Sequence, residues 1–305
     1  MRSPVSRPII TIESAPEIIK IADRALKAAG AKGKLPTPIE ELIQAANIRD
    51  KDTEGVITRF VSSLNEGGKL LFRSTLQKLR GIADLRQRAI YVPSDTAPRE
   101  RFAKGHELGH QLIPWHHVGA ESVSSFYQDT DFTLSPFVKD IFDIEANFFA
   151  SEVIFQGKLF THRARDYKPS FEAVFLLADL HGASRQATMR RFVEVQDEIL
   201  ACVSYLPSLY ERHDGLPILR APRLIGSSGF NRKFPQVSLP TQIPTDHPWS
   251  LARTNKNVSF GEIDLYCDGS LVRFEWQGWW NNYALLVLLR RRPSLGTIGR
   301  LLALR

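Results

Sequence analysis

The chain has 305 residues, 43% of them hydrophobic and 24% charged, which is enough for a substantial buried core and about two domains. Its net charge of +7 leans toward an acidic partner, but Lys and Arg are spread along the whole chain, so a dedicated nucleic-acid site is not favoured. The two cysteines, Cys202 and Cys267, form no C-x-x-C pair, which argues against a disulfide scaffold and a thiolate metal site.

The N-terminal segment has no feature of an exported protein. We expect residues 1–15 to form a flexible lead, and they lack the long apolar core of a signal peptide. The most apolar run of the chain, residues 284–289, is far too short to span a bilayer. We therefore expect a soluble cytoplasmic protein with no membrane partner.

The first elements after the lead are two helices and three short strands. Apolar residues recur at helical spacing over residues 17–29. A second helix is predicted from Thr37, as its N-cap, to residue 47, with Pro38 in the first turn and Glu40 three residues after the cap. Stretches rich in branched and aromatic residues then predict strands at residues 56–62, 69–73 and 88–92.

Four further helices are predicted in the middle of the chain. The first has Thr96 as N-cap and ends near residue 113, because Pro114 cannot continue it. We expect residues 115–135 to form a connecting loop. The remaining helices are predicted at residues 136–155, 171–180 and 184–202.

The last third of the chain is predicted to be β-rich. Prolines and glycines become frequent after residue 206, and strands are predicted at residues 258–267, 271–276 and 283–290, with Asp268-Gly269 as a hairpin turn. The predicted fold class is α+β. A mainly helical domain with a small β-sheet spans residues 16–206, and a C-terminal β-rich domain spans residues 207–305.

The sequence His106-Glu107-Leu108-Gly109-His110 predicts a metal site on a helix. Residues four apart lie on one face of a helix, so both histidines can bind one ion. Catalytic zinc sites use such ligands and keep one position for water, whose pKa the metal lowers to about 7. Glu107 can take the proton from that water as general base. The motif therefore favours a zincin-like metallopeptidase that uses Zn²⁺.

Gly109 is an unusual residue for the interior of this helix. Glycine costs roughly 1 kcal/mol against alanine there. A better helix former is expected at this position unless space beside the metal site is tight.

The third metal ligand has to come from downstream acids on the helix predicted at residues 136–155. At 100° per residue, Asp143 shares a face with Asn147 and Ala150, whereas Glu145 points nearly the opposite way. If the face with Asn147 and Ala150 packs on the zinc helix, Asp143 points toward the metal. Glu145 would then lie in solvent or support the site by hydrogen bonds. Asp143 is the predicted ligand, and Glu145 is the alternative.

Two segments resemble the signatures of the ImmA/IrrE metallopeptidase family. The first is Arg101-Phe102-Ala103-Lys104-Gly105 followed by the His106 motif, and the second is Glu145-Ala146-Asn147-Phe148-Phe149-Ala150. The helix start at residues 35–42 and the segment 177–184 are also similar to the family. The resemblance covers roughly residues 15–200.

The resemblance implies a cytoplasmic regulatory protease that acts in stress responses or transcription regulation, with a helix-turn-helix repressor as protein substrate. The family's third ligand is a glutamate four residues before the asparagine of the second signature. That position is Asp143 here, which is one methylene shorter. The family's Leu-Leu-Met-Pro is replaced by Val153-Ile154-Phe155-Gln156, so contacts with substrate near this end are expected to differ. Residues 207–305 lie outside the resemblance, and their position suggests a sensor or docking domain.

Other histidines and a basic helix give weaker signals. His116 and His117 could orient the site or bind a second metal, but a solvated loop pair is expected more often. His162 and His181 could stabilise an oxyanion, although no spacing selects them. Among four aromatic residues near the C-terminus we expect a core or interface role. These are Trp276, Trp279, Trp280 and Tyr283.

A second function class stays open at this point. The helix predicted after Gly182 resembles half of a helix-turn-helix and carries Arg185, Arg190 and Arg191. The chain could therefore be a non-proteolytic regulator that binds DNA or a repressor through the same fold. Glu107 favours the peptidase, because a pure binding site has no need of a general base.

Overall fold

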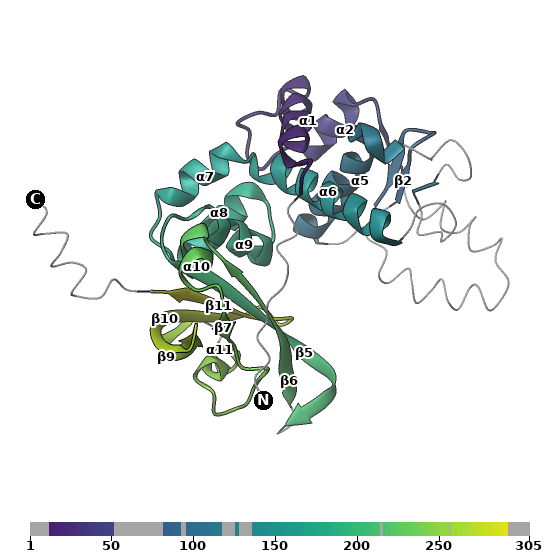
Figure 1. The fold of residues 1–305 in the computed structure, drawn as a ribbon. Coiled ribbons are helices and arrows are strands. Elements are labelled where there is room, and N and C mark those ends of the chain that lie inside the picture. The colour runs from purple at the N-terminus through teal and green to yellow at the C-terminus, as the bar shows by residue number, and fades with distance from the viewer. Residues whose placement is uncertain are drawn as a thin grey trace, which may run out of the picture. The chain divides into compact units, whose positions relative to one another are not determined.

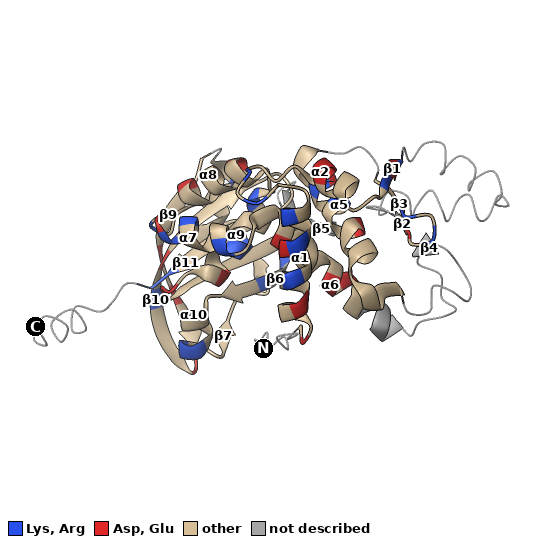
Figure 2. Ribbon diagram, turned by 90° about the horizontal axis from the view of Figure 1, so that it is seen from above, with Lys and Arg blue, Asp and Glu red and all other residues tan. Residues whose placement is uncertain are grey.

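The computed structural model describes residues 12–51, 82–92, 96–117, 126–127, 136–213, 216–255 and 257–291. Helices and strands are mixed, so the α+β class is confirmed (Figure 1). Lys and Arg are distributed over many of these elements and alternate with Asp and Glu (Figure 2). Among the described residues, no helix is both long and apolar enough to cross a membrane.

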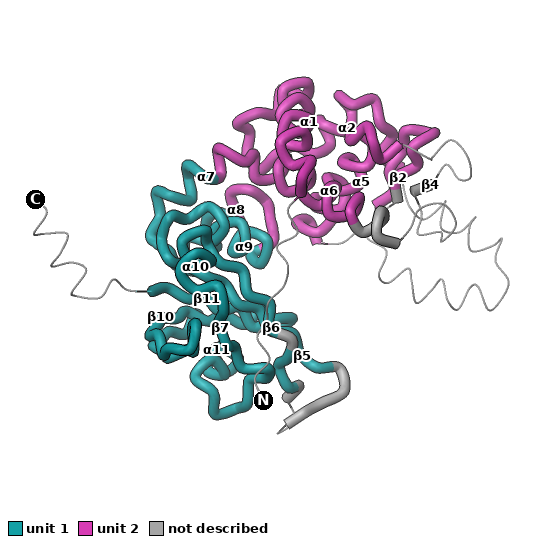
Figure 3. Tube along the Cα trace, in the orientation of Figure 1, with its two compact units in different colours: residues 1–9, 161–177, 185–305 teal, residues 10–160, 178–184 magenta. Residues whose placement is uncertain are grey.

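The chain divides into two compact units (Figure 3). The helical unit consists of residues 10–160 and 178–184, and the sheet unit of residues 1–9, 161–177 and 185–305. The units are not consecutive along the chain, because helix α8 (Phe171–His181) contributes to both. The predicted boundary near residue 206 would instead separate two consecutive segments.

The helical unit combines helices with a small sheet. Its helices are α1 (Ala15–Ala28), α2 (Ile39–Ala45), α5 (Ala97–Leu112), the 3-10 helix η1 (Pro114–His117) and α6 (Pro136–Phe155). Its strands are β1 (Arg49–Lys51), β2 (Ile82–Asp84), β3 (Ala89–Tyr91) and β4 (Phe126–Tyr127). The strand order is β1-β3-β2-β4, with β1 parallel to β3 and the other pairs antiparallel.

The predicted helices of this unit are confirmed, and of the two predicted N-cap residues only Thr96 occupies the N-cap position. Thr37 precedes α2, yet its hydroxyl donates to the carbonyl of Val153 at 2.9 Å, and Pro38 occupies the N-cap position. Thr96 is the N-cap of α5 by position, without a side-chain hydrogen bond to the helix. The hydroxyl of Thr37 therefore joins α2 to the end of α6. It does not cap its own helix.

Helices α5 and α6 cross at close range. A β-carbon at Gly109 would lie 3.1 Å from the ring of Phe149 and 3.2 Å from the Cα of Ala146. A β-carbon at Gly105 would lie 3.3 Å from the Cβ of Ala150. The expectation that space is tight at Gly109 is confirmed, and this crossing brings α6 within reach of the His106 motif.

Gln156 ends α6 in a positive-φ conformation, with φ of 51°. Its amide nitrogen donates to the carbonyls of Lys34 and Ala31, at 2.9 and 3.2 Å, and its amide oxygen accepts the N–H of Gly33 at 2.7 Å. Gln156 therefore ties the loop between α1 and α2 to α6.

The sheet unit is built on seven antiparallel strands. They are β5 (Leu200–His213), β6 (Leu216–Gly226), β7 (Val237–Ser238), β8 (Gln242–Ile243), β9 (Ser259–Cys267), β10 (Ser270–Trp280) and β11 (Leu285–Arg290), in the order β7-β9-β10-β11-β5-β6-β8. Its helical segments are most of α7 (Lys158–Arg165), most of α8, α9 (Arg185–Val195), α10 (Ser228–Lys233), η2 (Pro248–Ser250) and α11 (Leu251–Thr254).

The strands predicted at the C-terminal end are confirmed. Asp268 and Gly269 have φ values of 49° and 80°, which is the two-residue hairpin geometry expected for this pair. Trp276 is buried in the core beside Phe274, whereas Tyr283 is 67% exposed. The predicted aromatic cluster is therefore only in part a core feature.

The prediction for this region differs from the structure in several places. The helix predicted at residues 184–202 is wrong beyond Val195, because residues from Leu200 onward pair with β11 as strand β5. Strand β6 and helix α7 were not predicted. The run Leu200 to Tyr205 is apolar without a clear period, and such a run does not distinguish a buried strand from a buried helix.

Two predicted strands, at residues 56–62 and 69–73, lie outside the described residues. The strand predicted at residues 88–92 is confirmed as β3, whereas β1 and β2 were not predicted. Each described strand of this sheet has two or three residues, which is too short for a period-2 pattern to stand out.

Candidate metal centre

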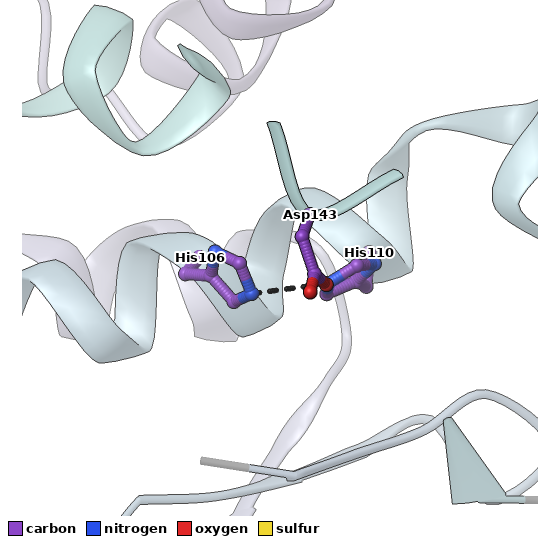
Figure 4. A group of neighbouring side chains, drawn as sticks. All are labelled: His106, His110 and Asp143. Atoms are coloured by element: carbon purple, nitrogen blue, oxygen red, sulfur yellow. Dashed lines mark hydrogen bonds and ion pairs between the residues drawn. The ribbon is translucent and has the colours of Figure 1, made fainter. Parts of the chain in front are cut away.

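Helix α5 places His106 and His110 one turn apart, so that their rings meet on the same face (Figure 4). The Nε2 atoms of the two rings lie 3.1 Å from each other. His110 is buried, whereas His106 is half-buried. The spacing in the sequence therefore places two imidazole nitrogens at a common point.

Helix α6 adds Asp143 to this point (Figure 4). Its Oδ1 atom lies 3.7 Å from Nε2 of His110, and one ligand atom from each of the three residues lies within 4.8 Å of the others. The Asp143 side chain is 45% exposed, so the group is open on that side. The three residues named from the sequence as ligands are thus brought together.

Glu145, the alternative ligand, lies outside this group. Its Oε2 accepts hydrogen bonds from Nε1 of Trp115 at 2.7 Å and from Nε2 of His116 at 2.9 Å, while its Oε1 accepts one from the Ser14 hydroxyl. Its side chain is only 7% exposed. The expectation that Glu145 lies in solvent is therefore wrong, whereas the alternative expectation, that it forms hydrogen bonds, is confirmed. Two residues along a helix turn the side chain by about 200°, which directs Glu145 away from Asp143.

Each histidine of the pair contacts a polar side chain through its second ring nitrogen. Nδ1 of His106 lies 3.2 Å from Oδ1 of Asn147, and Nδ1 of His110 lies 3.0 Å from Nδ1 of His116. A proton on each Nδ1 satisfies these contacts and leaves the lone pair of each Nε2 pointing into the group. This is the usual arrangement around histidines that bind metal.

The donor set fits a divalent cation. Two lone pairs that face each other at 3.1 Å repel unless a positive charge lies between them. Two imidazole nitrogens and one carboxylate oxygen are ligands that zinc accepts in catalytic sites, with a fourth position left for water. His106, His110 and Asp143 could therefore hold a metal ion, and this ligand set suits several divalent metals.

Burial keeps His110 of the group and its neighbour His116 in the neutral form. Burial lowers the pKa of His110 well below its usual value, and the nearby His106, His116 and His117 lower it further. Burial also lowers the pKa of His116, although its hydrogen bond to Glu145 opposes this shift. A neutral imidazole is the form that binds a metal ion.

Glu107 follows His106 on α5 and is buried, with 5% of its surface exposed. Burial raises the pKa of its carboxyl to about 8, and the negative charge of Asp143 contributes to the rise. A carboxyl group in this state exchanges its proton near neutral pH, which is the property of a general acid and base.

His116 is the neighbour of His110 that the sequence argument undervalued. The expectation of a solvated loop histidine is wrong, since His116 belongs to η1, is buried and contacts His110. Its ring stacks on Phe142, with centroids 4.3 Å apart. The signal in the sequence was small: Pro114 ends α5 abruptly, and His116 follows His110 by six residues.

Three further histidines that the structure describes are not part of the group. Nε2 of His117 lies 3.1 Å from the carbonyl of Gln111. His181 is buried in the core of the helical unit, with Nδ1 3.3 Å from the carbonyl of Ile154 and its ring against Phe160. His162 is exposed on α7. The contacts of His181 are with core groups and give no support to the oxyanion role considered for it.

Two arginines of α9 have partners within the sheet unit. The guanidinium of Arg185 lies 4.5 Å from the ring centre of Phe175 and 5.2 Å from that of Trp279. Arg190 forms an ion pair with Glu194 at 3.0 Å. Two of the three arginines that suggested a DNA-binding helix therefore already contact side chains of the protein itself.

Comparisons with known proteins find a likeness of fold and no significant likeness of sequence. No protein-family model matches the sequence, and a comparison with curated proteins finds no significant match. The fold is similar to that of a Mycobacterium tuberculosis transcriptional regulator, with a TM-score of 0.51 and 11% sequence identity over 90% of this chain and 86% of the other. At this identity the likeness concerns the fold alone.

Proposed function

We propose that the protein is a zinc-dependent endopeptidase of the ImmA/IrrE type. His106, His110 and Asp143 hold the metal, and Glu107 is the general base. The observation that carries the proposal is a buried Glu107 carboxyl, next to His106 in the chain, together with a His-His-Asp group that could hold a metal ion. A site that only binds metal has no need of this carboxyl, whose burial is costly.

The residues of the site divide the work of peptide hydrolysis. A divalent ion, when bound, polarises the peptide carbonyl and acidifies water. Glu107 takes a proton from the attacking water and passes it to the leaving amide nitrogen. Burial raises the pKa of this carboxyl to about 8 without metal, and the positive charge of a bound ion would lower the pKa toward the range of a base. The exposed side of Asp143 leaves the group open to a polypeptide.

The substrate we propose is a cytoplasmic helix-turn-helix repressor. Support comes from the resemblance of the two sequence signatures and from the fold, which is similar to that of a protein described as a transcriptional regulator. Cleavage of a repressor would give a metallopeptidase a role in transcription regulation.

The test uses the full-length protein loaded with one equivalent of Zn²⁺ and a peptide library made from a bacterial proteome. New termini are identified by mass spectrometry. We expect cleavage by the parent and none by Glu107→Gln, with the same zinc content in both proteins. Identical termini from both would show that the activity does not depend on Glu107, and the peptidase proposal would then fail.

A second candidate is a regulator that binds DNA or a repressor without cutting. The likeness to a transcriptional regulator favours it. Its test is a gel-shift titration at several salt concentrations, because contacts to phosphates make affinity fall steeply with salt. A steep response that is equal in the parent and in Glu107→Gln would support this candidate over the peptidase.

A further inference from the structure

We propose that His116 and Glu145 form a hydrogen-bonded relay that positions His110 for metal binding. In this relay Nδ1–H of His110 donates to Nδ1 of His116, and Nε2–H of His116 donates to Oε2 of Glu145. The inference rests on the proposed function in one respect, namely that a cation binds at His106, His110 and Asp143.

The direction of each hydrogen bond follows from the carboxylate. An ionised carboxylate only accepts, so Nε2 of His116, 2.9 Å from Glu145, carries the proton. A neutral His116 then has a lone pair on Nδ1, and His110, whose Nδ1 is 3.0 Å away, has to donate. His110 is left with its lone pair on Nε2, the atom that faces His106 and Asp143. The relay therefore selects the tautomer that can bind metal.

The far end of the relay is anchored in two places. The Glu145 carboxylate accepts hydrogen bonds from Trp115 on η1 and from Ser14 at the start of α1, in addition to that from His116. Hydrogen bonds to an ionised group are about twice as strong as neutral ones. Glu145 is thus held by donors from two different elements, and it can fix the His116 ring in turn.

The His116 ring is also fixed by its surroundings. It is buried, it stacks on Phe142 with an angle of 23° between the rings, and its backbone N–H donates to the carbonyl of Ile113 at 3.1 Å. Pro114 begins the short η1 helix that carries it. These contacts leave the backbone and ring of His116 little conformational freedom, so its contact with His110 is fixed.

The two imidazole ligands are supported unequally as a result. His106 is half-buried and contacts the neutral amide of Asn147. His110 is buried and contacts His116, which is itself hydrogen-bonded to the Glu145 carboxylate. A carboxylate behind a ligand histidine raises its basicity toward the metal. Loss of the relay should therefore weaken metal binding more than loss of the Asn147 contact.

Two substitutions of His116 separate the two halves of the relay. His116→Asn places an amide oxygen near the position of Nδ1 and keeps an acceptor for His110. His116→Gln places its amide near Nε2, so it reaches Glu145 but leaves Nδ1 of His110 without its acceptor. Metal-free full-length proteins are titrated with Co²⁺ against a competing chelator, and the visible absorption of the bound ion is recorded.

We expect His116→Gln to bind Co²⁺ about 10- to 100-fold more weakly than the parent, the usual effect of losing such a partner, and to shift the Co²⁺ spectrum. His116→Asn should bind more tightly than His116→Gln. Asn147→Ala should weaken binding less than His116→Gln does. Glu145→Gln, which keeps the shape of the side chain and removes the charge, should weaken binding about 10-fold.

The matched control is His117→Gln, on the same short helix, whose contact is with the Gln111 carbonyl. It should bind Co²⁺ as the parent does. Circular dichroism of each metal-free variant shows whether it has folded, and Glu145→Gln keeps the test valid if the His116 variants do not fold.

Two outcomes would overturn the proposal in different ways. If His116→Gln and Glu145→Gln bind Co²⁺ with the affinity and spectrum of the parent, the relay is refuted while the proposed function stands. If the parent binds no Co²⁺, or His110→Ala binds it equally well, the relay and the proposed function fail together.

Discussion

Gly109 on α5 faces Ala146 on α6 so closely that a β-carbon at position 109 would lie 3.2 Å from the Cα of Ala146. The atom it meets is backbone, which cannot move aside without shifting the helix. Because α6 also carries Asp143, the distance between these two helices sets the distance between Asp143 and the two histidines.

The first prediction concerns this crossing. Gly109→Ala should lower the free energy of unfolding, since overpacking costs about 1–3 kcal/mol and exceeds the gain of about 1 kcal/mol in helix propensity. It should also weaken zinc binding by displacing Asp143. Urea denaturation and a zinc titration measure the two effects. Greater stability of Gly109→Ala with unchanged zinc affinity would contradict the packing argument.

The second prediction separates the two acids of α6. Asp143→Ala should lose most of its zinc on dialysis, because only two protein ligands remain of the three that a catalytic site needs. Glu145→Ala should retain zinc with reduced affinity, since Glu145 acts through His116. Zinc content is measured by atomic emission against His117→Gln as control. Full retention of zinc by Asp143→Ala would exclude it as a ligand.

The third prediction concerns removal of the metal. A ligand that binds only the folded state stabilises it by about 2.7 kcal/mol when its free concentration is 100 times Kd. Zinc should therefore raise the Tm of the parent, and a chelator should reverse the change. Calorimetry on Asp143→Ala provides the control, in which zinc should have little effect on Tm. An equal rise in both proteins would place the binding site elsewhere.

The fourth prediction concerns pH and the sheet unit. Burial lowers the pKa of His247, with Asp246 opposing the shift, and Nδ1 of His247 accepts the N–H of Trp249 at 3.2 Å. The unfolded chain takes up a proton near pH 6.5, whereas the folded protein takes it up only at lower pH. The stability contributed by neutral His247 is thus present above pH 6.5 and falls as pH drops below it.

The variant for this prediction is His247→Asn, which keeps an acceptor for the Trp249 N–H and does not titrate. Urea denaturation of both proteins at pH 7.5, 6 and 5 gives the difference in free energy of unfolding. This difference should change in favour of the variant as the pH falls. A difference that stays constant would show that His247 does not titrate with unfolding.

Local patterns were sufficient for several parts of the fold. Helix α6 was predicted with its observed bounds, since its apolar residues recur at helical spacing and Gly157 follows its end. The Asp268-Gly269 turn needs two positive φ angles, which this pair adopts at low cost. By contrast, the first residues of β5, 200–202, were predicted as the end of a helix, because only pairing with β11 decides the conformation of an unpatterned apolar run.

His106, Glu107 and His110 could be identified as candidate site residues from the sequence alone. The reason is that a spacing of four residues places two side chains on one face of any helix. The sequence also favoured Asp143 over Glu145, because 100° per residue separates their directions. Tertiary structure alone decided that Glu145 and His116 meet behind His110, since their contact joins three elements. Such a contact depends on how helices pack, which no local period encodes.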